Sequence, residues 1–358
     1  MPSLKEIKGR INSISSTLAI TSAMKMVAAA KLQKAQMAIQ NMLPYERRLH
    51  SMLIDLMGAM NISAAASEDG SVRGSGSAER GFDQSGDRLS LSNRHDLAGM
   101  DGAYSLMAQR EVRKVAIVAF ASNSSLCGAF NSNVIREATA VINEYRASGL
   151  GDADITVYSV GRKMAEAMKK LGFPSPADFT KMSDSPSYDA ASALAQELLD
   201  GFVSGRFDKV ELVYNHYKST SSQPTTRQTY LPLSLADATA DLQAGKIADS
   251  ASESDTNRGA ETVGAPVVRQ GSPTTEDLIV EPSKEALIAI LLPKVIRLRI
   301  FTTLLDSAAA EHAARTVAMQ LATDNGNDLL QELTLEYNKG RQQKITSEIL
   351  DLVGGSMQ

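Results

Sequence analysis

The stretch SAMKMVAAAKLQKA, residues 22–35, reads as an uninterrupted helix that carries small or flexible apolar groups and no cofactor ligand. It belongs to a longer pattern, in which the residues of one helix face recur at alternating steps of three and four; this face would form the seam, the line of contact with a partner helix. Such a sustained heptad stripe predicts a helix that lies along another long helix. The stripe comprises Leu4, Ile7, Ile11, Ile14, Leu18, Thr21, Lys25, Ala28, Leu32, Ala35, Ile39 and Met42, and it resumes past Pro44 at Leu49, Leu53, Leu56 and Met60.

The C-terminal part of the chain supplies a partner for this helix. From about Ser283 to Val353 it holds helix formers, with a single proline at Pro293 and scattered glycines. One heptad stripe here is apolar at its ends but polar in its middle, where it contains Asp324, Asp328 and Gln331. Either the helix rotates and a neighbouring stripe takes over the seam, or the polar groups meet a partner. The neighbouring stripe is made of Leu330, Leu333 and Tyr337.

Strands and helices alternate between these two terminal helices. Val112–Phe120, Ile155–Val160 and Lys209–Tyr217 are rich in residues typical of strands, and Thr226–Leu233 is a candidate edge strand. Helical patterns fall between them at Ser132–Arg146, Arg162–Lys170 and Tyr188–Val203. This alternation predicts a parallel sheet covered by helices, and thus an α/β fold class.

Two segments fit neither pattern, because they are rich in Ser, Gly, Asp and Ala and poor in apolar clusters. They indicate solvated insertions at the junctions between the terminal helices and the central domain. The expected organisation is a helix over 1–62, an insertion over 63–106, an α/β domain over 107–234, a second insertion over 235–277 and a final helix over 278–358.

Composition excludes several classes of function. With 358 residues and 43% hydrophobic content, the chain can bury a real core. A net charge of −4 argues against bulk attraction to nucleic acid or anionic lipid. No run approaches the roughly 18 apolar residues of a transmembrane helix, and the N-terminus lacks the pattern of a signal peptide.

Common catalytic and ligand-binding motifs are missing as well. Gly245-Lys246 lacks the rest of a phosphate loop, and the four histidines have no metal-ligand spacing, so we expect no cofactor and no metal. Cys127, the one cysteine, could be a nucleophile at a turn between strand and helix. The stronger interpretation is that Cys127 is buried, Gly128 allows close packing, and Asn131 or Ser132 caps the following helix.

Three local matches, in this order, carry a resemblance to a known family. They are AMKMVAAAKLQKAQ at 23–36, SLCGAFNSNV at 125–134, and AARTVAMQLATDNGNDLLQEL with YNKGRQQKITSEILDLVGG at 313–355. Together they make the chain similar to the gamma subunits of rotary F-type ATP synthases, over nearly its whole length apart from the two insertions.

The resemblance implies an antiparallel coiled coil of the terminal helices with an inserted Rossmann-like α/β domain. It also implies a noncatalytic rotor, which couples proton or sodium flow through the membrane sector to conformational change at catalytic beta subunits. The expected partners are the alpha and beta subunits, the epsilon subunit and the membrane c-ring, and no nucleic acid. The expected location is the cytoplasmic side of a bacterial inner membrane, as a peripheral subunit.

Residues that match the family's contacts between rotor and beta subunits follow from the same resemblance. Met24 and Lys25 in the first helix, with Arg315 in the last, match a region that couples rotation to the beta subunits. Arg341, Gln342 and Thr346 match residues that contact the beta catch loop. All three can form hydrogen bonds that break as the rotor turns.

Two departures from the family pattern stand out. Asn123-Ser124-Ser125 replaces the Asp-Arg-Gly of many members, and the paired cysteines of the plastid regulatory insertion are absent. Two rival hypotheses stay open at this point: a coiled-coil scaffold with an inserted α/β domain, and an α/β enzyme that uses Cys127.

Overall fold

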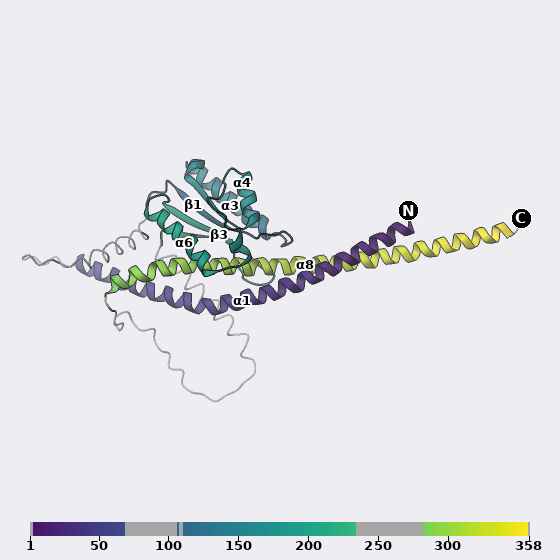
Figure 1. Cartoon of the computed structure of the whole chain (residues 1–358), viewed down its shortest axis with the longest axis horizontal. Helices are drawn as coiled ribbons and strands as arrows, with labels where there is room; N and C mark the ends of the chain where they lie inside the picture. Colours follow the sequence, from purple (N-terminus) through teal and green to yellow (C-terminus); the bar gives the residue numbers. More distant parts are fainter. Residues whose placement is uncertain (1–2, 69–105, 107–109, 234–280, 282, 357–358) are drawn as a thin grey trace, which may run out of the picture.

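Two long antiparallel helices form the axis of the molecule, and a globular domain sits against one side of them (Figure 1). The computed structural model describes residues 3–68, 106, 110–233, 281 and 283–356. Helix α1 spans Leu4–Glu68 and helix α8 spans Lys284–Ser356. Each helix continues through its proline, Pro44 in α1 and Pro293 in α8. The predicted pairing of the two terminal helices is therefore confirmed.

The heptad stripe of α1 forms its contact face. Ile7, Ala28 and Leu32 are buried, as are Leu49, Leu53 and Leu56 after the proline. Leu32 packs in a small cluster with Ala309 and Ala313 of α8. The last stripe position, Met60, lies among side chains outside the described ones.

The stripe on α8 changes where the sequence turns polar. Asp324, Asp328 and Gln331 are exposed, whereas Leu333 is buried and Leu330 and Tyr337 are partly buried. This burial confirms rotation onto the neighbouring stripe, as expected for a straight helix that drifts against a seven-residue repeat. That the polar groups meet a partner stays a prediction. The displaced polar side chains face solvent.

The globular domain is built on a four-stranded sheet of order β2-β1-β3-β4. The strands are β1 (Val115–Phe120), β2 (Ile155–Val160), β3 (Lys209–Asn215) and β4 (Thr225–Leu231). β1 pairs parallel with β2 and β3, and β4 is an antiparallel edge strand on β3. The α/β class and the edge strand are confirmed, with β3 ending two residues before the predicted Tyr217 and β1 starting three residues after Val112.

Helices cover both faces of this sheet, which explains why β1 is buried at every position. Val115, Ile117 and Ala119 face a core shared with α3 (Phe130–Ala147) and α4 (Arg162–Lys170). The alternate residues of β1 face a second core, shared with α6 (Tyr188–Val203) and with both long helices. The sheet is thus anchored to the coiled coil through its second face (Figure 1).

Two short elements complete the domain. The sequence predicted neither the 3-10 turn η1 (Asp152–Asp154) nor the helix α5 (Thr180–Asp184). Gly161 makes the sharp turn from β2 into α4 with φ of 99°, and a Cβ there would lie 2.0 Å from the carbonyl oxygen of Ala121. Only glycine fits this turn.

The two predicted insertions fall almost entirely outside the described residues, and α1 extends to Glu68, past the helix boundary expected at 62. Within the described part of the chain, no helix combines the length and the apolar character needed to cross a membrane.

Candidate functional site

Met24 and Lys25 lie in the middle part of α1, where the two helices are closely paired. Both side chains are partly buried, and Ala28 beside them is buried in the seam. Met26 and Val27 point the other way and are 66% and 58% exposed. This part of α1 therefore has one face in the coiled coil and an apolar face open to a partner.

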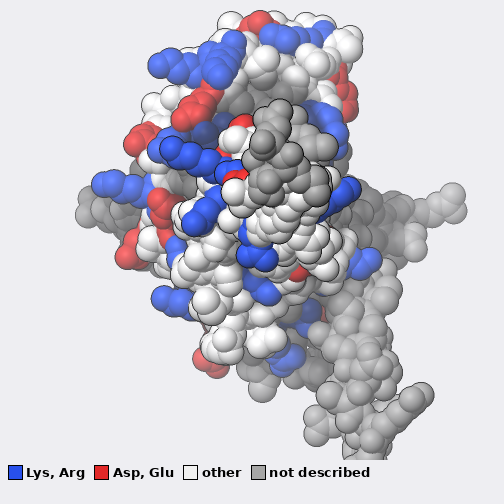
Figure 2. Space-filling model, turned by 90° about the vertical axis from the view of Figure 1, so that its right-hand side faces the viewer, with Lys and Arg blue, Asp and Glu red and all other residues white. Residues whose placement is uncertain are grey.

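Arg341, Gln342 and Thr346 lie at the free end of α8. The paired part of the two helices ends at Gly340, whose missing side chain leaves room for Leu4 of α1. Past that contact α8 continues alone (Figure 1), and the three side chains are exposed. Figure 2 looks onto this end, where Lys and Arg side chains lie around the projecting helices among uncharged ones. The free end thus offers donors to a partner.

Arg315 lies at a junction between α8 and the globular domain. Its Nη1 is 2.7 Å from Oε1 of Glu311, and its Nη2 donates to Oγ of Ser124 at 2.7 Å. The two charged side chains are only 12% and 10% exposed. Arg315 therefore joins α8 to the loop after β1 through contacts within the chain.

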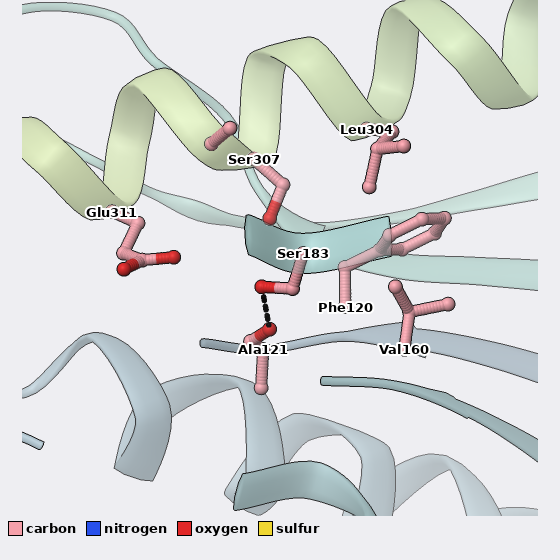
Figure 3. Close-up of a pocket in the computed structure, with 8 residues that line it drawn as sticks. Phe120, Ala121, Val160, Ser183, Leu304, Ser307 and Glu311 are labelled. Atoms are coloured by element: carbon pink, nitrogen blue, oxygen red, sulfur yellow. Dashed lines mark hydrogen bonds between the residues drawn. The ribbon is translucent and has the colours of Figure 1, made fainter. Parts of the chain in front are cut away.

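Glu311 also borders a small cavity between the sheet and α8 (Figure 3). Ser307 and Glu311 enter it from α8, and Ser183 enters from α5, where its hydroxyl donates to the carbonyl of Ala121 at 2.9 Å. Burial raises the pKa of Glu311, although the charge of Arg315 opposes this. The same surroundings lower the pKa of His312 to about 4, chiefly through burial.

A second junction lies at the carboxyl end of β3. Oδ2 of Asp306 lies 2.6 Å from Nδ1 of His216, and its Oδ1 accepts a hydrogen bond from the backbone N–H of Tyr217 at 2.9 Å. The hydroxyl of Tyr217 accepts from Nε2 of Gln36 on α1 at 2.6 Å. One strand end thus holds both long helices.

Cys127 lies in a structural loop. It is 1% exposed, and Nδ2 of Asn131 lies 3.2 Å from its sulfur. The prediction that Asn131 or Ser132 caps the helix is wrong. The cap position is Ala129, without a side-chain cap, because the Asn131 side chain instead accepts from the backbone N–H of Ser122.

A buried charge cluster in the globular domain has no counterpart in the sequence-based predictions. The side chain of Glu211 is 2% exposed and receives hydrogen bonds from Tyr145 and Arg227 at 2.6 Å each, with Nζ of Lys209 at 2.7 Å. Burial pushes the pKa of Glu211 up, but these partners outweigh it and lower the pKa. The alternation of Lys209 and Glu211 on one strand face was the only signal available.

No three His, Cys, Asp or Glu side chains in the described ranges cluster as a metal site would require. The six candidate residues form three separate groups. Thr21, near Met24 and Lys25, meets Thr323 of α8 with their hydroxyl oxygens 3.1 Å apart. Arg341 lies 18 residues beyond Thr323, which is about 27 Å along a helix. The partly buried pair Met24 and Lys25 and the exposed residues at the end of α8 therefore lie at two separate places along one axis, and Arg315 stands apart from both.

Comparisons with known proteins agree with this architecture. The family model described as ATP synthase matches residues 3–357. The ATP synthase gamma chain of Phocaeicola vulgatus is 47% identical over 357 residues, covering all of both chains, and that of Bacteroides thetaiotaomicron is 45% identical over 358. Among solved structures, a chain of the Euglena gracilis mitochondrial ATP synthase OSCP/F1/c-ring structure has a TM-score of 0.52 at 18% identity. That match covers 99% of this chain and 93% of the other.

Proposed function

Because the chain belongs to the ATP synthase gamma chain family, we propose that it turns as the central-stalk rotor inside a ring of alpha and beta subunits. It is a noncatalytic subunit, since the catalytic sites lie on the beta subunits. The observation that carries this function is identity of up to 47% along the full length, shared by both long helices and the globular domain. That match favours the rotor over a general coiled-coil scaffold and over an enzyme built on Cys127.

The rotor would act through contacts that depend on its orientation. The rotor is asymmetric about the coil axis, since the globular domain lies on one side of the paired helices (Figure 1). A turn of such a rotor stabilises one conformation of a neighbouring beta subunit over the others, because it makes different contacts with each. Ion flow through the membrane sector, whether of protons or of sodium, would drive that rotation.

Two surfaces are proposed to make these contacts. Met24 and Lys25 are the candidates in the paired part of the coil, and Arg341, Gln342 and Thr346 are the candidates at its free end. Their partial or full exposure supports this assignment. For Arg315 we propose an indirect role in coupling, because its guanidinium is occupied by Glu311 and Ser124.

The proposed partners at the other end of the rotor are the epsilon subunit and the membrane c-ring. The chain would therefore be peripheral, held at the cytoplasmic side of a bacterial inner membrane by the complex. The bacterial relatives support that location.

Reconstitution tests the proposal. The purified chain should hydrolyse no ATP alone, and it should restore rapid hydrolysis when mixed with separately purified alpha and beta subunits of the same organism. Failure to assemble with them would overturn the rotor function.

A further inference from the structure

Two glycines of α8 each face a leucine of α1. A Cβ on Gly326 would lie 2.6 Å from Cδ2 and 3.2 Å from Cγ of Leu18, and one on Gly340 would lie 3.2 Å from Cδ2 of Leu4. A contact below 3.0 Å requires the neighbour to move, so any side chain at 326 would have to displace the end of the partly buried Leu18 side chain. Each glycine thus forms a notch that holds a leucine.

The spacing of the notches matches that of the leucines. Leu4 and Leu18 are two heptads apart, and Gly326 and Gly340 are also two heptads apart. In an antiparallel pair, one alignment of the helices therefore places Leu18 against Gly326 and Leu4 against Gly340 at the same time. A slip of one heptad would place Leu18 opposite Leu333 or Met319, both of which are already buried in the seam. Large side chains would then collide, which costs packing energy.

Helix preference does not explain these glycines. Glycine in a helix interior is unfavourable relative to alanine, because it loses more conformational freedom on folding. Gly9 of α1 provides a contrast, since a Cβ there would meet nothing within 4 Å. Gly326 differs from Gly9 in having a leucine seated on it, with the Thr21–Thr323 contact beside it.

We propose that Leu18 and Leu4, seated on Gly326 and Gly340, are positioning residues that fix the axial register of the coiled coil. Gly340 directly precedes Arg341, so this register sets the height and direction at which Arg341 and Gln342 leave the coil. The proposal rests on the proposed rotor function, because it assigns these notches the task of orienting the surface that meets the beta subunits.

The first test uses the complete complex in inverted membrane vesicles, with the ions pumped per ATP hydrolysed as readout. Gly326→Ala should lower this ratio roughly twofold or more, by disturbing the register. Gly326→Ala combined with Leu18→Ala should recover part of the loss, because the smaller side chain fits beside the new Cβ. Gly9→Ala, the matched control, should leave the ratio unchanged. A variant that only folded poorly would reduce the amount of complex and not the ratio.

The second test measures the register directly in the full-length chain. Cysteines in place of Thr21 and Thr323 should form a disulfide readily under a mild oxidant, since the native hydroxyl oxygens are 3.1 Å apart. Adding Gly326→Ala should slow this reaction on the order of fivefold, whereas adding Gly9→Ala should not.

The results separate cleanly. Unchanged cross-linking with Gly326→Ala overturns the proposal, whether or not pumping falls, and so does a double variant that pumps no better than Gly326→Ala alone. Failure of the rotor function itself would look different, since even the wild-type chain would then restore no pumping to a complex that lacks it.

Discussion

His216 at the end of β3 and Asp306 on α8 lie 2.6 Å apart, from Nδ1 to Oδ2, and join the globular domain to the rotor shaft. The hydrogen bond to Asp306 raises the pKa of His216 above its ordinary 6.5, although burial and Lys218 oppose the shift. A raised pKa means that the pair stabilises the fold fully below pH 6.5 and loses this effect as the pH rises through the raised value.

The pH dependence of unfolding tests this pair. Because the imidazole side chain is 50% exposed, we expect only about 0.5 kcal/mol of stabilisation. Denaturant unfolding at about pH 6 and about pH 9 should show this difference in the wild type. His216→Gln should remove it while keeping the bond from Tyr217 N–H to Asp306. An equal pH dependence in the variant would contradict the assignment.

Removal of the donors at the free end should impair coupling and spare the fold. Arg341→Ala together with Gln342→Ala should lower ATP synthesis roughly tenfold or more, since a hydrogen bond to a charged group contributes about 1.5–3 kcal/mol. The unfolding midpoint should not change, because both positions are exposed. Synthesis in inverted vesicles measures the effect. Glu336→Ala removes a charge from the side of the same helix turned away from both residues, at another exposed position, and serves as control. Equal losses in both variants would argue against a specific role.

The buried charge cluster should dominate the stability of the globular domain. Glu211→Ala should lower the free energy of unfolding by about 3–5 kcal/mol, because it leaves the charges of Arg227 and Lys209 without their carboxylate partner, next to a buried cavity. Asp152→Ala removes an equally short contact, 2.6 Å to Arg146, but at an exposed site, and should change the free energy of unfolding far less, because solvent screens an exposed ion pair.

The lowered pKa of Glu211 adds an acid dependence with a definite sign. Its stabilising effect is present above the ordinary value of 4.5 and is lost as the pH falls through the lowered value. Unfolding curves below about pH 4.5 should therefore converge for the wild type and Glu211→Gln. Curves that stay parallel on acidification would refute this.

Arg315 should be required for its geometry as well as its charge. Arg315→Ala leaves the buried carboxylate of Glu311 without its partner and should cost about 3 kcal/mol in unfolding. Arg315→Lys should recover only part of this, because a single ammonium cannot match the two guanidinium contacts to Glu311 and Ser124. Full recovery with lysine would show that charge alone suffices.

Periodic parts of the fold were predictable from the sequence. The bounds of β2, α4 and α6 agree with the predicted ranges residue for residue, because strand and helix periods are local properties. The antiparallel alignment at Leu18 and Gly326 was not predictable in this way. It depends on two side chains that are far apart in the chain, and a glycine within a helix carries no sign of what fills the space beside it.

The site residues depend on contacts to other subunits, so their roles stay predictions. The family resemblance assigned Arg341 and Gln342, and the structure leaves both exposed. It assigned Arg315 as a contact to beta subunits, and that role stays a prediction, since the side chain already pairs with Glu311. The Glu211 cluster was missed, because its members come from α3, β3 and β4 and meet only after folding.

The end of α8 past Gly340 has a mechanical consequence. Two packed helices resist bending and twisting far more than one, so a load applied along the coil deforms the unpaired residues 341–356 first. The paired part would therefore transmit a rotation of the globular domain with less deformation than the unpaired last turns. Small mismatches between successive rotor positions and the surrounding ring would then be absorbed as elastic strain in this single helix.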